Sequence, residues 1–339
     1  MEAIVGLPSW VKKNKKLRIK VLGIGGGGNK AVDAMIAEGN FDENIRFVSL
    51  NTDEQDLKVS LASTKVQLGK IVTKGEGAGC NPEIGKKAAD ESFETIKKNL
   101  TGADIIFLVA GLGGGTGTGA VPVIAKAVKE LGILSVAVVT MPFDFEGPGK
   151  RELAESGLAK LRKEVDTTVI VENTKLVSGE NEDKTMVECY ALSDNVLKDS
   201  IKAIVDIIDK PGRKNIDPAD LKRALKGNNL AIIGMGRASG KDKAVKATAQ
   251  ALQAIALGCD NISGASYILS SIASSTDISA RDNSTVKKMI SSFGGPGHIH
   301  KDGTIFDDKL GDEIIVYVIL TGISVLKDSE KQAQDSENV

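Results

Sequence analysis

The chain has 339 residues, of which 41% are apolar, so it is long enough for two domains that each bury a core. Its 44 Lys and Arg nearly balance its 45 Asp and Glu, which argues against nucleic acid or an anionic membrane as the main partner. Three separated cysteines and two histidines favour neither a disulfide framework nor a zinc site, so we expect a cytoplasmic protein. No apolar run approaches the roughly 20 residues of a membrane helix, so we expect no membrane insertion.

The first half of the chain has the pattern of repeated β-α units. An apolar strand from residue 17 precedes a glycine loop and a helix predicted over 29–38. Further apolar strands are predicted over 45–50, 103–110, 133–141 and 167–171, with helices over 119–131 and after Pro148. Continuous apolar strands that alternate with helices indicate a parallel sheet covered on both faces, whose ligands bind at the carboxyl ends of the strands.

A long helix is predicted to join this unit to a second one. Over 186–209, apolar residues recur at three- and four-residue spacing, and Pro211 and Gly212 end the pattern. A smaller α/β unit follows, with helices over 218–226 and 241–256 and strands over 229–236, 265–272 and 312–320. We therefore predict an N-terminal extension (1–16), a first domain (17–185), a central helix (186–210), a second domain (211–326) and a polar tail (327–339).

Two glycine loops precede predicted helices. The loop after the first strand contains Gly23-x-Gly25-x-x-Gly28, and Asp53 follows the next strand, as in dinucleotide-dependent oxidoreductases. The second loop, over 113–119, has five glycines in seven residues, and its two threonines, Thr116 and Thr118, are expected to add hydroxyl donors. Free N–H groups at a helix N-terminus bind anions, and glycines let the backbone approach them. Two such loops predict one ligand with several phosphates, which leaves the oxidoreductase as a distant alternative.

The second loop, GGGTGTG, resembles the signature loop of the tubulin/FtsZ family. Six further motifs resemble the family in order, from about residue 17 to residue 323: GxGGGG (23–28), NTD (51–53), GAGCNPEIG (77–85), PFDFEG (142–147), DNVL (194–197) and NIDPAD (215–220). The glycine-rich first loop and the short linkers are closer to the FtsZ branch than to eukaryotic tubulin. The resemblance implies an α/β fold with an N-terminal Rossmann-like GTP-binding domain, a long central helix and a smaller C-terminal GTPase-activating domain.

The resemblance also implies which residues bind GTP. The phosphates would be contacted by Gly25, Gly26, Gly27, Ala78, Gly79, Gly113, Gly114, Gly115, Thr116 and Gly117. Glu146 would accept from the ribose, while Asn173 and Asp194 would read guanine, because a carboxylate accepts from adjacent N–H groups that adenine does not present in that arrangement. The family commonly has asparagine where Lys30 stands and arginine where Lys150 stands. We expect positively charged contacts near the phosphates from Lys30, Lys150 and the following Arg151.

The catalytic acids are expected on the second domain, because the first domain contains no histidine and its acids have other assignments. Asn215, Asp217 and Asp220 match the loop that this family inserts into the nucleotide site of the next subunit, where the acids position water. Asp217 is also suited to cap the helix that begins at Pro218. At about 1.5 Å per residue, the central helix separates Asp194 from this loop by roughly 20 Å or more. The implied cofactors are GTP or GDP, phosphate-bound Mg²⁺ and, as a further option, K⁺, with no metal ligands from the protein.

These implications predict a GTP-timed, head-to-tail homopolymer of prokaryotic cell division, located at the division site. Alternatives within the family are a filament for cell shape or for DNA segregation, and a paralogue that does not hydrolyse GTP, which Asp217 and Asp220 disfavour. The chain does not end in the Pro/aromatic/basic peptide that bacterial relatives present to membrane-tethering adaptors, which favours an archaeal origin and leaves the adaptor unidentified. Trp10 and the basic segment 12–16 are another possible tether, although a solvated arm is the favoured interpretation.

Overall fold

The computed structural model describes residues 16–323 except 40, 179–180, 211, 215, 228, 259–263 and 277. Trp10 and the predicted polar tail therefore lie outside the described residues, as does all but Lys16 of the N-terminal extension. Within the described part of the chain, no helix combines the length and apolar character needed to cross a membrane.

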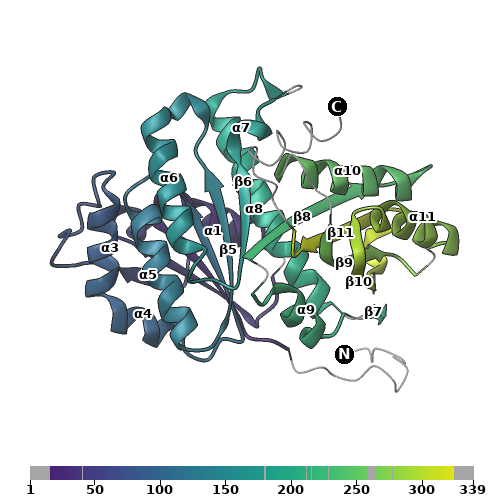
Figure 1. The fold of residues 1–339 in the computed structure, drawn as a ribbon, viewed down its shortest axis with the longest axis horizontal. Helices are drawn as coiled ribbons and strands as arrows, with labels where there is room; N and C mark the ends of the chain where they lie inside the picture. Colours follow the sequence, from purple (N-terminus) through teal and green to yellow (C-terminus); the bar gives the residue numbers. More distant parts are fainter. Residues whose placement is uncertain are drawn as a thin grey trace, which may run out of the picture.

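The first six strands form a parallel sheet in the order β3-β2-β1-β4-β5-β6 (Figure 1). They are β1 (Ile19–Ile24), β2 (Ile45–Asn51), β3 (Thr64–Gln67), β4 (Ile105–Gly111), β5 (Leu134–Met141) and β6 (Thr167–Glu172). This order is typical of doubly wound nucleotide-binding sheets, whose ligands lie at the point where the strand order reverses. The predicted α/β class and parallel sheet are confirmed.

The remaining strands continue the same sheet. They are β7 (Gly212–Lys214), β8 (Asn229–Ala238), β9 (Ala265–Ser274), β10 (Gly294–Phe306) and β11 (Ile314–Thr321), in the order β8-β11-β9-β10-β7. The joint is narrow, because β8 pairs with β6 at three positions only, in parallel. Beyond it, β11 is antiparallel to both of its neighbours, and β10 is parallel to β9 but antiparallel to β7. The two predicted domains therefore share one mixed sheet.

The helices cover both faces of this sheet (Figure 1). They are α1 (Gly25–Glu38), α2 (Glu54–Val59), α3 (Pro82–Glu91), α4 (Phe93–Leu100), α5 (Thr116–Glu130), α6 (Pro148–Leu161), α7 (Asn173–Leu176), α8 (Met186–Asp209), α9 (Pro218–Leu225), α10 (Lys243–Gly258) and α11 (Ala280–Ser291). Our predicted starts of α1 and α5 are wrong by four and three residues, because the glycine loops themselves form the first helical turns.

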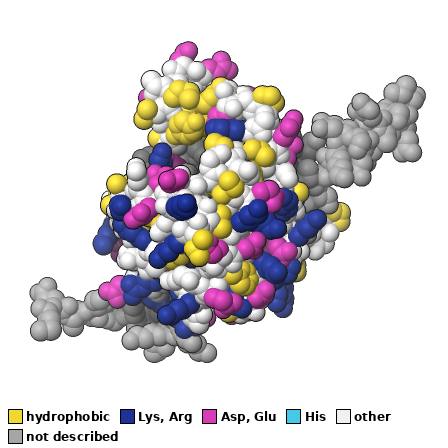
Figure 2. Space-filling view, turned by 90° about the vertical axis from the view of Figure 1, so that its left-hand side faces the viewer, with side chains coloured by type: hydrophobic (Ala, Val, Ile, Leu, Met, Phe, Trp, Pro, Cys, Tyr) yellow, Lys and Arg dark blue, Asp and Glu magenta, His cyan; other side chains and the backbone are white. Residues whose placement is uncertain are grey.

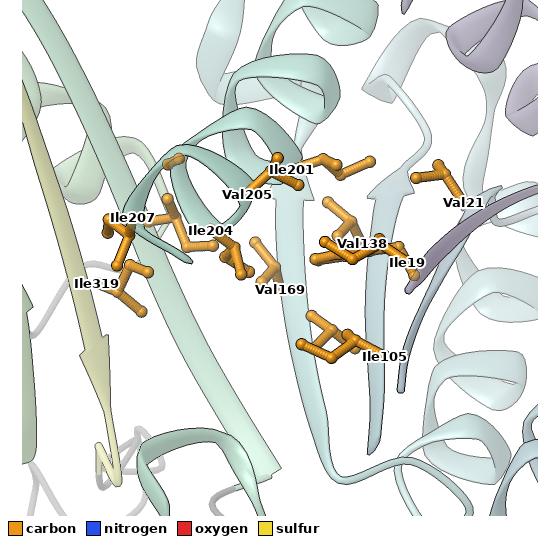
Figure 3. Packing of buried hydrophobic residues seen from close by; sticks show 14 of the residues in the cluster. Ile19, Val21, Ile105, Val138, Val169, Ile201, Ile204, Val205, Ile207 and Ile319 are labelled. Carbon is orange, nitrogen blue, oxygen red and sulfur yellow. The ribbon is translucent and has the colours of Figure 1, made fainter. Parts of the chain in front are cut away.

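The predicted central helix, α8, packs between the two halves. Its Ile204 lies beside Val169 of β6, and its Ile207 lies beside Ile319 of β11 (Figure 3). All four side chains are buried in one apolar cluster that runs through both halves of the molecule. Burial of each such side chain stabilises the fold by about 1.5 to 3 kcal/mol, so α8 supplies a hydrophobic connection in addition to the narrow sheet joint.

Candidate nucleotide site

The loops after β1, β2 and β4 meet at the carboxyl ends of the parallel strands. An ideal Cβ atom on Gly25 would lie 2.9 Å from the backbone nitrogen of Gly117, so the two glycine loops are in contact. The hydroxyls of Thr52, after β2, and Thr116, after β4, lie 2.6 Å apart. The expected convergence of the two glycine loops is confirmed.

The helices α1 and α5 begin at this point without side-chain caps. Neither has a capping side-chain hydrogen bond or an acidic residue in its first turn. The neighbouring helices differ, because Asp53 caps α2 and Asn81 caps α3. The free N–H groups and dipoles of α1 and α5 favour an anion between them. Asp53 itself is engaged by two backbone N–H groups, so it acts as a helix cap where an oxidoreductase would direct an acid at ribose.

The glycines of the two loops have different surroundings. A Cβ on Gly28 would lie 2.2 Å from a carbonyl oxygen of β4, and one on Gly117 would lie 2.3 Å from the carbonyl oxygen of Gly111. These glycines are therefore required for close packing. A Cβ on Gly114 would meet no described residue within 4 Å, and Gly27 is exposed. Gly27 and Gly114 are thus the positions at which a phosphate can approach the backbone.

The segment before α3 forms a third wall of the site. A Cβ on Gly115 would lie 2.9 Å from the Cβ of Ala78 and 2.8 Å from the backbone nitrogen of Asn81. Ala78 is buried, whereas Gly79 has a φ of +54° and open space around its Cβ position. Ala78 and Gly115 hold the walls together, and Gly79 offers its backbone to a ligand.

Buried polar side chains that we did not predict fix the loops. Asn51 donates to the Oδ1 of Asn29 at 3.0 Å, and Asn29 donates to the carbonyl of Gly23 at 2.8 Å. Our expectation for Thr118 is wrong, because its side chain is buried and its hydroxyl accepts from the N–H of Gly113 at 2.8 Å. Thr118 therefore shapes the loop from within, as the two asparagines do.

The residues predicted to read guanine lie together. Ser193, next to Asp194 on α8, donates from its hydroxyl to the Oδ1 of Asn173 on α7 at 2.8 Å. Burial raises the pKa of Asp194 to about 6, and the positive charge of Lys30 opposes this rise. The structure thus brings Lys30, Asn173 and Asp194 to one side of the site.

Tyr190 is a further residue of this region that our sequence analysis missed. It precedes Asp194 by one helical turn and therefore lies on the same face of α8. Its side chain is 43% exposed, and its ring lies edge-on to Phe143 with centroids 5.4 Å apart. An exposed aromatic ring can stack on a base, so the four-residue spacing from Asp194 was the signal that could have identified it.

Glu146, Lys150 and Arg151 are engaged within the chain. The Oε1 of Glu146 accepts from the N–H of Phe143 at 3.1 Å, and its Oε2 pairs with Lys150 at 2.9 Å. This carboxylate raises the pKa of Lys150. Arg151 pairs with Glu172 at 2.6 Å and with a glutamate of its own helix at 2.8 Å. Glu146 lies beside the site, but the contacts of Arg151 direct it to β6 and α6.

The predicted catalytic acids lie on α9, which Figure 1 shows at the opposite end of α8 from α7. Asp217 caps α9 by accepting from the N–H of Ala219 at 2.7 Å, so its expected capping role is confirmed. Asp220, in the first turn, pairs with Lys301 of β10 at 3.3 Å. Asn215 lies outside the described residues. The acids are separated from Asp194 by most of the 24-residue helix α8.

Comparison with known proteins identifies the family of both halves of the chain. Residues 18–180 match the Tubulin/FtsZ family, GTPase domain, and residues 229–324 match the FtsZ family, C-terminal domain. The chain is 43% identical to the cell division protein FtsZ of Pseudomonas aeruginosa over 305 residues, which cover 90% of this chain and 77% of that protein. It is 41% identical to the cell division protein FtsZ of Mycoplasmopsis pulmonis over 319 residues, which cover 94% and 80%.

Solved structures agree with the family matches. An empty FtsZ dimer from M. jannaschii has a TM-score of 0.84 and 36% identity, over 91% of this chain and 89% of that one. CetZ2 from Haloferax volcanii, in a GTPγS-bound protofilament, has a TM-score of 0.76 and 21% identity over 95% and 100%, and it supports the fold alone. The glycine loops converge on one site, the sequence matches both family models, and the architecture matches the solved FtsZ structure. The chain therefore belongs to the tubulin/FtsZ family.

Proposed function

We propose that the chain is a GTPase that assembles head to tail into filaments of prokaryotic cell division. The observation that carries this proposal is the placement of two uncapped helix N-termini at one end of α8 and of two acids at the other. Such a subunit binds a nucleotide at one end and offers acids to its neighbour's nucleotide at the other. Contact between unlike surfaces extends into an open filament when the rotation does not close. The dimer of the M. jannaschii FtsZ supports self-association.

In this proposal the phosphates of GTP lie between α1 and α5. The open backbone of Gly27, Gly79 and Gly114 and the hydroxyl of Thr116 face them, while the crowded glycines and Ala78 hold the walls in place. We also assign Gly25, Gly26, Gly113 and Lys150 to the phosphate side, and Gly115 and Gly117 to the packing of its walls. A charge-assisted hydrogen bond is stronger than a neutral one, so this arrangement favours a polyanion.

The base and sugar lie toward α8. Asp194 accepts from the adjacent N–H groups of guanine, Asn173 makes a second polar contact, and the exposed ring of Tyr190 stacks on the base. Glu146 accepts from the ribose hydroxyls. When the nucleotide binds, this contact replaces part of the ion pair that Glu146 forms with Lys150. Lys30 contributes a positive charge near Asp194.

Mg²⁺ is part of the proposal through the nucleotide. In the described part of the chain, no group of three acidic, cysteine or histidine side chains forms a cage. Mg²⁺ keeps several waters and is commonly held by substrate phosphates with few protein ligands, so in this proposal it binds together with the nucleotide. When bound, Mg²⁺ would supply positive charge that offsets the charge of the phosphates. K⁺ is a further option at the interface between subunits.

Hydrolysis then depends on positioned charges. Asp217 and Asp220 present two carboxylates at the N-terminal end of α9, and in the filament they orient the water that attacks the γ-phosphate. Asn215 is assigned to the same loop. Loss of the γ-phosphate weakens the contact between subunits, so the nucleotide sets the lifetime of the filament.

The proposed location is the cytoplasm at the division site, with a membrane-tethering adaptor still to be identified. Figure 2 shows that Lys and Arg are interspersed with Asp and Glu on the face formed by α3 to α6. Mixed charge of this kind does not favour nucleic acid. A filament for cell shape or DNA segregation would share the biochemistry, and loss of septa after depletion of the protein in cells would favour the division role.

The first test is GTP hydrolysis per subunit as a function of protein concentration. We expect a rate near zero in dilute protein and a steep rise above a threshold, with sedimentation of polymer at the same threshold. ATP is the control nucleotide and is expected to give neither. A rate per subunit that does not change with concentration would mean that each subunit contains a complete active site, and the proposal would then fail.

The raised pKa of Asp194 predicts how GTP affinity depends on pH. Accepting two N–H groups requires the ionised carboxylate, so protonation competes with guanine binding. We expect constant affinity in neutral solution and a loss of roughly tenfold per pH unit below about pH 6. Replacing Lys30 with glutamine should shift the midpoint upward, because the charge of Lys30 lowers this pKa. Titration calorimetry that finds no change down to about pH 5 would contradict the role of Asp194.

A further inference from the structure

The segment that carries the two acids of α9 is fixed to one strand, β10. On its N-terminal side, β7 pairs antiparallel with β10, and Lys214 of β7 forms an ion pair with Asp302. On its C-terminal side, Asp220 forms an ion pair with Lys301, with 3.3 Å between Nζ and Oδ2. Consecutive residues of β10 therefore hold the segment on both sides.

Between these two ion pairs the chain lies close against the strand. Ile216 is buried, and a Cβ on Gly303 would lie 3.5 Å from its Cγ1 and 3.3 Å from the carbonyl oxygen of Lys214. Lys301 and Asp302 are neighbours in a strand, so their side chains leave opposite faces of the sheet. The strand thus provides a platform for the segment, and its Lys301 contacts one of the two acids, Asp220.

The pair formed by Lys301 and Asp220 reaches the solvent. The side chain of Lys301 is 46% exposed and that of Asp220 is 26% exposed. In the proposed filament this surface meets the triphosphate of the next subunit, whose charge has the same sign as the two carboxylates of α9. Like charges that approach one another across an interface oppose association, and a cation beside them reduces this repulsion.

We propose that Lys301 is a positioning residue for hydrolysis between subunits. Its ammonium group holds the Asp220 carboxylate in place and reduces the repulsion between that carboxylate and the phosphates of the neighbouring subunit. This inference rests on the proposed function of the chain. It adds a residue of β10, outside every motif that identified the family, to the machinery of the interface.

The test compares Lys301→Gln with the wild-type chain in the concentration series of GTP hydrolysis. We expect the threshold concentration to rise roughly two- to fivefold, the range that corresponds to one exposed ion pair. The difference should shrink as salt is added, because salt screens exposed charges. Well above the threshold, hydrolysis per subunit should be lower than in wild type, and Lys301→Arg should restore both quantities. GTP binding by dilute Lys301→Gln should be unchanged, which shows that the variant is folded.

Two further variants separate this role from a general effect of charge or stability. Lys288→Gln removes an exposed lysine from α11, and it should leave the threshold and the rate unchanged. In an Asp220→Asn background the threshold is measured by sedimentation of polymer, and Lys301→Gln should not raise it further, because the lysine acts through that carboxylate.

The outcomes distinguish failure of this inference from failure of the proposed function. A wild-type chain with a threshold, together with a Lys301→Gln variant of equal threshold and rate, would overturn the role of Lys301 alone. An equal loss in the Asp220→Asn background would also overturn it, because the lysine would then act elsewhere. A wild-type rate that is independent of protein concentration would overturn the filament proposal and this inference with it.

Discussion

Replacing Asp217 with asparagine is expected to lower GTP hydrolysis per subunit by about 10²- to 10⁴-fold, the range for loss of one acid or base group. Asparagine caps a helix as well as aspartate does, so the cap that Asp217 provides to α9 is retained. The nucleotide loops lie at the other end of α8, so GTP binding should be unchanged. Steady-state phosphate release at high protein concentration and titration of GTP into dilute protein measure the two quantities.

The second half of the chain contains a matched control for this substitution. Asp307 caps a short helical turn at Asp308–Leu310 by accepting from the N–H of Lys309 at 3.1 Å. Asp307→Asn therefore makes the same chemical change at another helix cap, and it should hydrolyse GTP at the wild-type rate. If Asp217→Asn also hydrolysed GTP at that rate, Asp217 would be no more than a cap, and the catalytic assignment would be wrong.

The strands that sequence predicts well are those buried on both faces. Every residue of β5 and β11 is buried, and both strands have predominantly apolar sequences. We did not predict β10, because all of its first nine residues are at least partly exposed and it contains four glycines and a proline. Its pairing with β9 and β7, which are distant in sequence, determines its conformation. Tertiary contacts of this kind leave little local signal.

The site was predictable where a single loop carries the signal. Glycine loops before helices identify the anion site, and they meet as expected. The hydrogen bond from Asn51 to Asn29 joins residues 22 positions apart, and only the fold brings them together. The error at Thr118 has a similar cause, because helix α5 begins before this residue and buries its hydroxyl. Orientation of a polar side chain depends on where the helix starts, and glycine-rich sequence leaves that start undetermined.

Replacing Asp194 with asparagine is expected to transfer specificity from GTP to XTP. Xanthine has a carbonyl where guanine has its exocyclic amine, so an amide can donate to that oxygen while it accepts from the neighbouring N–H. Guanine would instead face an amide in place of a charged acceptor, and we expect GTP affinity to fall by about 10²-fold or more. Competition between GTP and XTP in binding and hydrolysis measures the change. An Asp194→Asn variant that keeps its preference for GTP would remove Asp194 from the base contact.

The two variants together test whether the acids act on the neighbour's nucleotide. Asp217→Asn binds GTP but lacks one acid, whereas Asp194→Asn keeps both acids but binds GTP weakly. Neither should hydrolyse GTP alone. In a mixture that also contains XTP, both variants can assemble, and each GTP on an Asp217→Asn subunit can meet intact acids on an Asp194→Asn neighbour. GTP hydrolysis should therefore appear only in the mixture. If mixed polymer sediments while GTP remains intact, the acids do not act across the interface. Such a polymer places bound GTP next to a neighbour with both acids, so an active site shared between subunits would be complete.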